Sequence, residues 1–313
     1  MIIAEDCIGY FAKNMVQLFK FHGVPKIGVI GVGHQFVAAT PAELVYWLTP
    51  EKDYIPYIET HVIDGCNLNC KGCGHFAPLF GKRDFYDLDQ FRCDIRKLSE
   101  KADVITVRLM GGEPLIKEDF GEYIKIARQY LPNSNIRIAT NALPIPSLPQ
   151  SLLDLIRDSK VCIDITLYPP TQKIIDKIKG ILDKNHIVYN NSMLYHRHSK
   201  VIETFSRILK LHPQSNPMSA LARCGSQNCR FLRKGKLYKC PVDALIFKYS
   251  ETYKLDSFPP SMGIDIYAEN FVALLRKLDH EPVALCAWCS ETPQQFKWLA
   301  PSKCVMEDWL VAD

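Results

Sequence analysis

Between about residues 56 and 191, strand-like segments alternate with helix-like segments, and this alternation constrains the fold more than any other feature of the chain. The strand-like segments are short and apolar, whereas the segments between them place apolar residues at helical spacing. The expected strands span 57–64, 104–110, 136–140, 161–168 and 187–191, and the expected helices span 87–102, 120–131, 151–158 and 171–185. Strands that alternate with helices form βαβ units around a parallel sheet. We therefore expect an α/β fold with its active site at the carboxyl ends of the strands.

Twelve cysteines are unusual in a chain of 313 residues, and most of them fall into two groups. One group directly follows the first expected strand and consists of Cys66, Cys70 and Cys73. The other lies in the last third of the chain and consists of Cys224, Cys229, Cys240, Cys286 and Cys289. The N-terminus carries no recognisable secretory signal, so metal binding explains these spacings better than disulfides do. The remaining four cysteines stand alone and are expected to be small buried hydrophobes.

Three thiolates in one loop indicate a metal centre with one coordination position left open. A [4Fe–4S] cluster takes thiolate ligands, and with three protein ligands its fourth iron can bind another group. Zinc is the alternative, because its ligands commonly stand a few residues apart in pairs. A zinc ion would need a fourth ligand, for which His75 is the nearest candidate. The loop by itself favours iron–sulfur over zinc.

Glycines and polar residues follow the next three expected strands at the same edge of the sheet. GGEP follows the second strand, and an asparagine and a threonine lie near the ends of the third and fourth, so the set is Gly111, Gly112, Glu113, Pro114, Asn141 and Thr166. Glycines let a backbone approach a ligand closely. Together with the cysteine loop, this order of motifs over residues 57–191 resembles the radical S-adenosylmethionine (radical SAM) superfamily. CNLNCKGC fits the C-x3-C-x2-C cluster motif of that family, and GGEP fits its methionine-binding motif.

The resemblance implies a partial (βα)6 barrel over about residues 56–218 that holds a [4Fe–4S] cluster on Cys66, Cys70 and Cys73. S-adenosylmethionine would bind the open iron. One electron from a low-potential donor such as flavodoxin or ferredoxin would then cleave it to methionine and a 5′-deoxyadenosyl radical. That radical takes a hydrogen atom from the substrate.

The resemblance also assigns residues around S-adenosylmethionine. Glu113, with the glycine backbone beside it, would hold the amino group, and Asn141 and Thr166 are expected to contact the carboxylate or the ribose. Family members commonly carry an aromatic residue before the third cysteine, close to the adenine. This chain has a glycine there, so His75 or Phe76 is expected to take that place.

The second cysteine group could bind zinc, as clustered cysteines in β-hairpins do. Its C-x10-G-x4-C opening and later C-x2-C also resemble the auxiliary-cluster domains of radical SAM enzymes, called SPASM and, in shortened form, twitch. The resemblance implies a small α+β twitch-like domain over about residues 219–313, with Gly235 in a hairpin turn. It also implies a second [4Fe–4S] cluster whose ligands are Cys224, Cys240, Cys286 and Cys289, with Cys229 as a rival to the first of these. Residues 1–55 form an N-terminal extension without an assigned role.

A cluster with four protein ligands cannot bind substrate through iron, so the expected role of the second cluster is electron transfer. Twitch relatives that dehydrogenate aminoglycoside alcohols use it in this way, which favours a two-electron oxidation of a sugar, aminocyclitol or similar polyol. The alternatives are a carbohydrate epimerase in which a thiol returns a hydrogen atom, a peptide-modifying radical SAM enzyme, and a zinc-binding interaction protein. The thiols considered for an epimerase are Cys304, Cys229 and, at the far end of its strand and so more simply a core residue, Cys162.

Oxidation of an alcohol also needs a base for the hydroxyl proton. The candidates, starting with the one in the cysteine loop that we prefer, are His75, Lys82, Asp84 and the run His196-Arg197-His198. The formal net charge of +4 is too small to indicate a nucleic acid or an anionic membrane as partner. No apolar run approaches the roughly 18 residues of a membrane-spanning helix. We therefore expect a cytoplasmic enzyme that acts on a small, sugar-like molecule.

Overall fold

The computed structural model describes residues 28–32, 35–39, 54–81, 85–190, 200–226 and 229–312. Within the N-terminal extension it describes two antiparallel strands, β1 (Gly28–Val32) and β2 (Gln35–Ala39). Lys82, Asp84 and the run from His196 to His198 lie outside the described residues, so these base candidates stay predictions.

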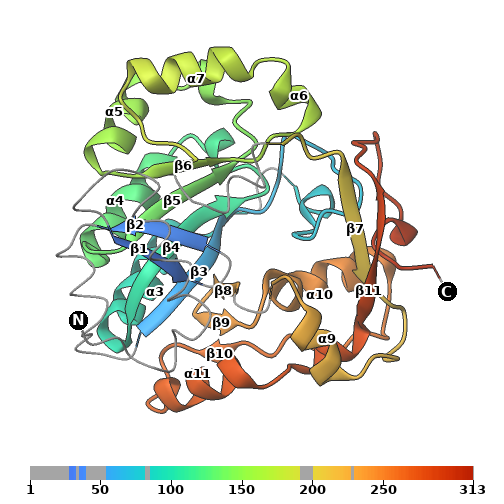
Figure 1. Cartoon of the computed structure of the whole chain (residues 1–313). Helices are drawn as coiled ribbons and strands as arrows, with labels where there is room; N and C mark the ends of the chain where they lie inside the picture. The colour runs from blue at the N-terminus through green and yellow to red at the C-terminus, as the bar shows by residue number, and fades with distance from the viewer. Residues whose placement is uncertain are drawn as a thin grey trace.

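A parallel sheet forms the centre of the molecule, and its strands follow one another in the order predicted from the sequence (Figure 1). The parallel strands are β3 (Tyr54–Ile63), β4 (Asp103–Gly111), β5 (Asn135–Thr140) and β6 (Cys162–Ile165). Of the strand expected over 187–191, the structure describes residues 187–190, and these make one isolated bridge to β6, between Ile163 and Tyr189, instead of a strand. The α/β prediction is confirmed.

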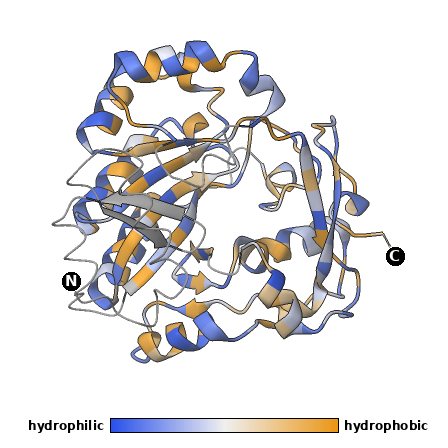
Figure 2. Cartoon of the chain, viewed as in Figure 1, coloured by the Kyte–Doolittle hydropathy of each residue, from blue (hydrophilic) through white to orange (hydrophobic). Residues whose placement is uncertain are grey.

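Helices between these strands cover the outer face of the sheet. They are α3 (Leu88–Lys101), α4 (Phe120–Tyr130), α5 (Gln150–Asp158), α6 (Pro169–Gln172) and α7 (Ile175–Lys184). Asp87 caps α3, because its carboxylate accepts hydrogen bonds from the backbone N–H groups of Asp89 and Gln90. The expected helix over 171–185 is broken into α6 and α7. Figure 2 shows hydrophobic and hydrophilic residues side by side on these helices, as amphipathic helices require.

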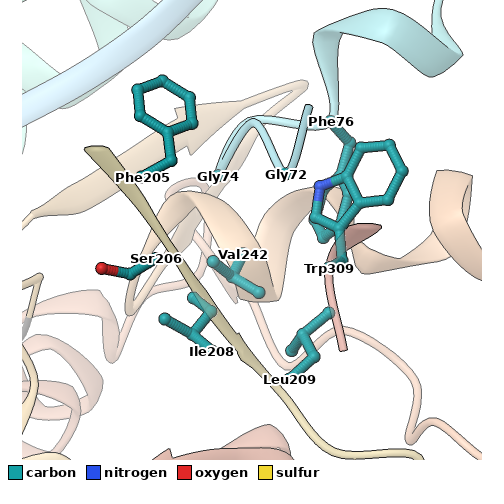
Figure 3. A pocket seen from close by; sticks show the side chains of 9 residues that line it. All are labelled: Gly72, Gly74, Phe76, Phe205, Ser206, Ile208, Leu209, Val242 and Trp309. Carbon is teal, nitrogen blue, oxygen red and sulfur yellow. The ribbon is translucent and has the colours of Figure 1, made fainter. Parts of the chain in front are cut away.

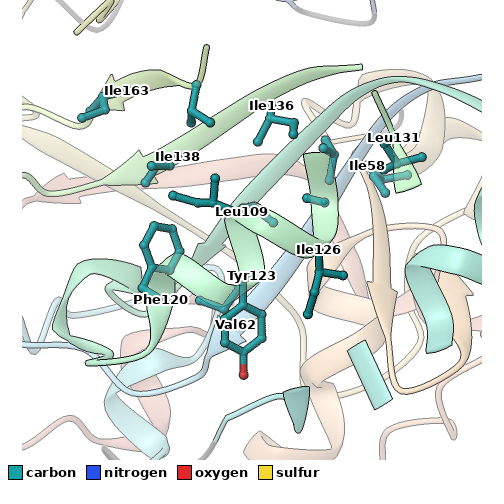
Figure 4. Close-up of a cluster of buried hydrophobic side chains, with 14 of the residues drawn as sticks. Ile58, Val62, Leu109, Phe120, Tyr123, Ile126, Leu131, Ile136, Ile138 and Ile163 are labelled. Carbon is teal, nitrogen blue, oxygen red and sulfur yellow. The ribbon is translucent and has the colours of Figure 1, made fainter. Parts of the chain in front are cut away.

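The main hydrophobic core lies between these helices and the outer face of the sheet (Figure 4). Every second residue of a strand faces it, such as Val107 and Leu109 of β4 and Ile136 and Ile138 of β5, all fully buried. The alternate residues of the same strands, such as Arg108 of β4, point to the opposite face of the sheet, which we call the inner face. The inner face is polar, and the candidate site is built on it.

The second half of the chain continues the same sheet. Strand β8 (Arg230–Arg233) pairs in parallel with β3, β9 (Lys236–Tyr238) pairs antiparallel with β8, and β10 (Ile264–Asp265) pairs antiparallel with β9. Lys234 and Gly235 form the β8–β9 turn with positive φ angles of 45° and 75°, so the predicted position of Gly235 in a hairpin turn is confirmed. The boundary predicted near residue 219 stays a prediction, but strands on both of its sides share hydrogen bonds.

A second hydrophobic core contains Phe231, Leu245 and Trp309, and further elements complete the described part of the chain. These elements are β7 (Thr204–Leu209), α9 (Pro217–Arg223), α10 (Pro241–Tyr253), α11 (Phe271–His280) and β11 (Cys289–Lys297), with short 3-10 helices at Ala77–Leu79, Pro114–Ile116, Ile145–Ser147, Ala284–Trp288 and Met306–Asp308. Strands β7 and β11 form a separate antiparallel pair. Within the described part of the chain, every helix is too short or too polar to span a membrane.

Candidate metal centre

The first cysteine group lies in the loop that leaves the carboxyl end of β3. Cys70 is buried, and Cys66 and Cys73 are half-buried. Burial raises the pKa of all three thiols, that of Cys70 to about 12, and the negative charges that Cys66 and Cys70 would feel from neighbouring thiolates raise theirs further. The thiols are therefore close enough to resist ionisation together, and a bound cationic cluster would relieve that repulsion.

Several N–H groups point at the sulfur atoms of this loop. The backbone N–H of Leu68 donates to Cys66 Sγ at 3.3 Å, and the side-chain amide of Asn141 donates to the same sulfur at 3.9 Å. The indole N–H of Trp298 donates to Cys70 Sγ at 3.3 Å. Hydrogen bonds to sulfur are a regular part of iron–sulfur sites. The donors and the three thiols therefore fit a [4Fe–4S] cluster with one open iron.

The two glycines of GGEP hold the cysteine loop against β4. A Cβ atom on Gly111 would lie 1.9 Å from the carbonyl oxygen of Ile63, and one on Gly112 would lie 2.2 Å from that of Gly65. The close approach allows Gly112 N–H to donate to Ile63 O at 3.0 Å and Glu113 N–H to donate to Gly65 O at 3.1 Å. We expected the glycines to let the backbone approach a ligand. In the structure they let two segments of the chain approach each other.

Glu113 is fully buried, and its carboxylate is occupied by the protein. Oε1 accepts from Leu115 N–H at 3.1 Å and from the hydroxyl of Thr140 at 2.6 Å, and Oε2 accepts from Asn141 N–H at 2.8 Å. Burial outweighs these three donors and raises the pKa of Glu113 to about 7. The side chain therefore ties the end of β4 to the end of β5. Its contact with the amino group of S-adenosylmethionine stays a prediction, as does the role of Pro114, which is buried behind it.

Asn141 and Thr166 lie beside the cysteine loop, as the sequence predicted. The Asn141 amide donates to Asn67 Oδ1 at 2.6 Å, so the end of β5 is joined directly to the loop. Thr166 is half-buried, and its backbone N–H donates to Thr140 O at 2.8 Å. The structure thus brings the cysteines, GGEP, Asn141 and Thr166 together at one end of the sheet. Their contacts to a bound molecule stay predictions.

His75 ends a chain of hydrogen bonds on the inner face. Its Nδ1 lies 2.9 Å from Nε2 of His61, and Nδ1 of His61 lies 2.8 Å from Asp64, which Arg233 also contacts with two N–H groups. With His61 neutral, Asp64 accepts the proton that His61 carries on Nδ1, and His75 then donates from its own Nδ1 to Nε2 of His61. Burial, assisted by the charges of His61 and Arg108, lowers the pKa of His75 well below its usual value. The Nε2 of a neutral His75 therefore remains unprotonated.

Two predicted site residues belong to the second core instead. Phe76 is 1% exposed and packs against Tyr249 and Trp309, so its ring is almost fully covered by the protein, which argues against a contact with an adenine. Cys304 is buried behind the cysteine loop, and its thiol approaches Asn69 O at 3.9 Å. This position does not face the inner side of the sheet, which argues against Cys304 as the thiol of an epimerase. Both residues pack against partners that are distant in sequence, so no local sequence pattern indicated these positions.

Four thiols of the second group lie near one another. Burial raises the pKa of each thiol, and the charges of neighbouring thiolates raise it further. Cys289 and Cys224 act in this way on Cys240, Cys224 acts on Cys286, and Cys286 and Cys224 act on Cys289. Cys240 caps the N-terminus of α10, where Asp243 N–H donates to its sulfur at 3.4 Å. Among the described residues, no three His, Cys, Asp or Glu side chains converge on the position of a single metal ion.

Cys229 points elsewhere. Its thiol faces Glu59 and Arg108 on the inner face of the sheet, and after burial the charge of Glu59 is the largest influence raising its pKa. The charge of Cys224 raises the pKa of Cys240, Cys286 and Cys289, and also that of Cys229. These links favour Cys224 of the two rivals, and the ligand set stays a prediction.

The inner face itself carries a buried polar network. Arg108 contacts Glu59 and donates to Asp164 at 2.9 Å, and Arg137 donates to the same carboxylate from Nε at 2.9 Å. Tyr57 donates to Glu59 at 2.6 Å. Each arginine thus faces a carboxylate, and the charges of the network balance. The sequence does carry a signal for this face. It is the presence of arginines and acidic residues in strands whose other residues are apolar.

A cavity of about 190 Å³ is lined by residues that neighbour both cysteine groups in sequence or in strand pairing (Figure 3). Glycines on both sides of Cys73 line it from one side. Leu209, which pairs with Cys289, and Val242, two residues beyond Cys240, line it from the other. Residues next to cysteines of both groups therefore line the same small, mainly apolar space.

Comparisons with known proteins agree with this site. Residues 60–212 match the model of the radical SAM superfamily. A GTP 3',8-cyclase of Sulfurimonas denitrificans is 29% identical over 135 residues, which cover 41% of this chain and 41% of the cyclase. The mycofactocin maturase MftC of Mycobacterium tuberculosis is 31% identical over 116 residues, 37% of this chain and 28% of the maturase. The alignments therefore span about two fifths or less of the length of these relatives.

Solved structures show a weaker likeness to this chain. BtrN in complex with AdoMet and 2-DOIA covers 76% of this chain and 94% of its own, with 16% identity and a TM-score of 0.41. Native anSMEcpe with bound AdoMet covers 43% of each chain, with 15% identity and a TM-score of 0.35. With the family match and the loop of three cysteines at the end of β3, residues 60–212 of this chain form a radical SAM domain.

Proposed function

We propose that this protein is a radical SAM enzyme that oxidises a sugar, aminocyclitol or similar polyol by two electrons, with a second [4Fe–4S] cluster as electron acceptor. The observation that carries this proposal is the gathering of Cys224, Cys240, Cys286 and Cys289 at one site, separate from the first cysteine loop. Four thiolates complete the ligand set of a [4Fe–4S] cluster. Such a cluster has no open iron, which suits electron transfer rather than substrate binding.

The residues of the chain divide the work of this oxidation. When bound, S-adenosylmethionine and the first cluster supply a 5′-deoxyadenosyl radical that takes a hydrogen atom from an alcohol carbon. The hydroxyl proton then passes to Nε2 of His75, whose Nδ1 is held by His61 and, through it, by Asp64. The remaining electron leaves across the apolar space lined by neighbours of both cysteine groups, where Phe76 and Trp309 pack together. Loss of a hydrogen atom, a proton and an electron turns the alcohol into a ketone.

The inner face supports an uncharged substrate. A triphosphate, which the name of GTP 3',8-cyclase implies for that relative, needs cationic side chains that are not already neutralised. The arginines that we place on the described inner face all contact carboxylates: Arg108 and Arg137 contact Asp164, and Arg233 contacts Asp64. Hydroxyl groups, in contrast, can exchange hydrogen bonds with Tyr57 and Glu59 without leaving a charge uncompensated. This balance of charge favours a polyol.

Iron and sulfide content after anaerobic reconstitution tests the second cluster. Two [4Fe–4S] clusters predict about eight irons per chain, and Cys224→Ser or Cys240→Ala should lower this to about four. Cys229→Ser is the matched control in the same segment and should keep about eight irons. If wild type binds about four irons, or if Cys229→Ser loses iron while Cys224→Ser does not, the acceptor role proposed here fails.

A carbohydrate epimerase is the second candidate, and the position of Cys229 favours it. This half-buried thiol faces the inner side of the sheet beside Glu59 and Arg108, where a hydrogen atom could be returned to a substrate radical. An epimerase run in deuterated water yields a product of unchanged oxidation state that carries deuterium, and Cys229→Ser abolishes it. A dehydrogenase yields a product two hydrogens lighter, and Cys229→Ser preserves it.

A further inference from the structure

The C-terminal strap, residues 296–309, wraps the loop of the first cysteine group from outside. Its backbone carbonyls at Leu299 and Pro301 accept hydrogen bonds from Lys71 N–H at 2.9 Å and from the Asn69 side chain at 2.6 Å. An ion pair of 2.8 Å joins Lys71 to Asp308. The strap therefore holds the cluster loop over its whole length, although more than 220 residues separate the two segments in the sequence.

Within the strap, Trp298 contacts a cluster ligand directly. Its indole N–H donates to Cys70 Sγ at 3.3 Å. The ring packs against Tyr168, with ring centroids 5.7 Å apart and an angle of 34° between the planes. The backbone N–H of Trp298 donates to Glu203 O at 2.8 Å, directly after the β7–β11 pairing ends. Backbone and ring are thus fixed from two sides, so the orientation of the N–H toward sulfur is built into the fold.

Trp309, at the other end of the strap, provides a contrast. It is 2% exposed, and its indole N–H donates to the backbone carbonyl of Cys73 at 2.8 Å, not to a sulfur. The two tryptophans therefore offer similar rings and similar donors to the same loop. Only one of them places a positive hydrogen against the charge of a thiolate ligand.

A hydrogen bond to a ligand sulfur acts on the reduction potential of the cluster. Reduction adds negative charge that spreads onto the ligand sulfurs, so a donor stabilises the reduced state more than the oxidised state and raises the potential. Burial acts in the opposite direction, because a low dielectric disfavours the extra charge. Cys70 is 6% exposed, so burial disfavours reduction at this ligand and the indole donor opposes that effect.

We propose that Trp298 is a positioning residue that raises the reduction potential of the first cluster through its hydrogen bond to Cys70. The second half of the chain thereby sets how readily the radical SAM centre accepts its electron. The proposal depends on the first cluster alone and holds whether or not the second cysteine group binds a cluster.

The test is a redox titration of anaerobically reconstituted, full-length protein, followed by electron paramagnetic resonance. The first cluster is identified as the one whose signal changes when S-adenosylmethionine is added. Trp298→Phe keeps a ring against Tyr168 but removes the donor, and should shift the one-electron equilibrium about tenfold toward the oxidised state, or about 59 mV downward. The matched control, Trp309→Phe, should shift it by less than twofold. An unchanged potential in Trp298→Phe, or equal shifts in both variants, overturns the proposal.

A measurement without the Trp298 substitution decides the matter if that variant fails to retain iron. Wild-type protein and Trp309→Phe are labelled with ¹⁵N in the indole ring, and pulsed electron paramagnetic resonance is recorded on the reduced first cluster. A ¹⁵N coupling that is present in both proteins supports the contact between Trp298 and the cluster. Its absence from wild type, or its loss in Trp309→Phe, overturns the proposal.

Discussion

Replacing Gly112 by alanine should separate the cysteine loop from the sheet. The added Cβ would lie 2.2 Å from Gly65 O and 2.3 Å from its carbonyl carbon, and neither of these backbone atoms can rotate away. Relief requires β4 and the loop to move apart, which breaks the hydrogen bonds from Gly112 N–H to Ile63 O and from Glu113 N–H to Gly65 O. Overpacking costs about 1–3 kcal/mol and each buried unpaired group about 1–3 kcal/mol. With one overpacked contact and two unpaired groups, we expect a loss of about 3–9 kcal/mol, a large part of the stability of a typical domain.

Urea unfolding of the cluster-free protein, followed by circular dichroism, measures this loss. Gly74→Ala is the matched control, because Gly74 lies in the same loop and a Cβ there would meet no atom within 4 Å. The control should unfold within about 0.5 kcal/mol of wild type. Iron uptake should fall in Gly112→Ala and remain unchanged in the control. If Gly112→Ala unfolds at the wild-type urea concentration, the glycine does not serve to bring the two backbones together, and its role must be sought in ligand binding.

Two further changes test buried carboxylates. Burial raises the pKa of Glu113 to about 7, whereas the same carboxyl in the unfolded chain releases its proton near pH 4.5. The free energy of unfolding should therefore fall by about 3 kcal/mol as the pH rises from about 4.5 to about 7. Urea unfolding at a series of pH values should show this decline in wild type and its loss in Glu113→Gln; parallel curves would contradict it. Asp164→Ala leaves Arg137 and Arg108 without their shared carboxylate and should cost about 3–5 kcal/mol in the same assay. Asp158→Ala, which removes an exposed partner of Arg157, should cost less than about 1 kcal/mol, and equal costs would refute the argument.

Local patterns were sufficient for the elements that place the site. The strand expected over 104–110 spans Asp103–Gly111, and the helix expected over 87–102 spans Leu88–Lys101. Their periodicity, caps and lengths are properties of contiguous sequence, and the order of the motifs along the chain determines which loops meet at one edge of a parallel sheet. The cysteine loop, GGEP and Asn141 therefore meet as expected.

Contacts between distant segments were beyond the reach of such patterns. The basic run RFLRKGK (230–236) is typical of a polar, exposed hairpin, and the segment is a hairpin, but Arg230 and Arg233 are buried. Their partners are Asp279 and Asp64, which lie 49 and 169 residues away. A sequence shows the charge of an arginine but not the carboxylate that compensates it. For the same reason, the sequence did not predict the contact between Trp298 and Cys70.

These distant contacts also explain why the sheet around the cysteine loop extends beyond the residues that match the radical SAM family. The family match ends at residue 212, yet β8, which follows it, is hydrogen-bonded to the strand that carries the cysteine loop. Without β8 the edge of β3 would be open to solvent and to other chains. Without the strap, Cys70 would lose the indole of Trp298 and Lys71 would lose Asp308. The centre is therefore specified by residues before 212 and completed by residues after it, so the second half of the chain is part of the radical site whatever its own cysteines bind.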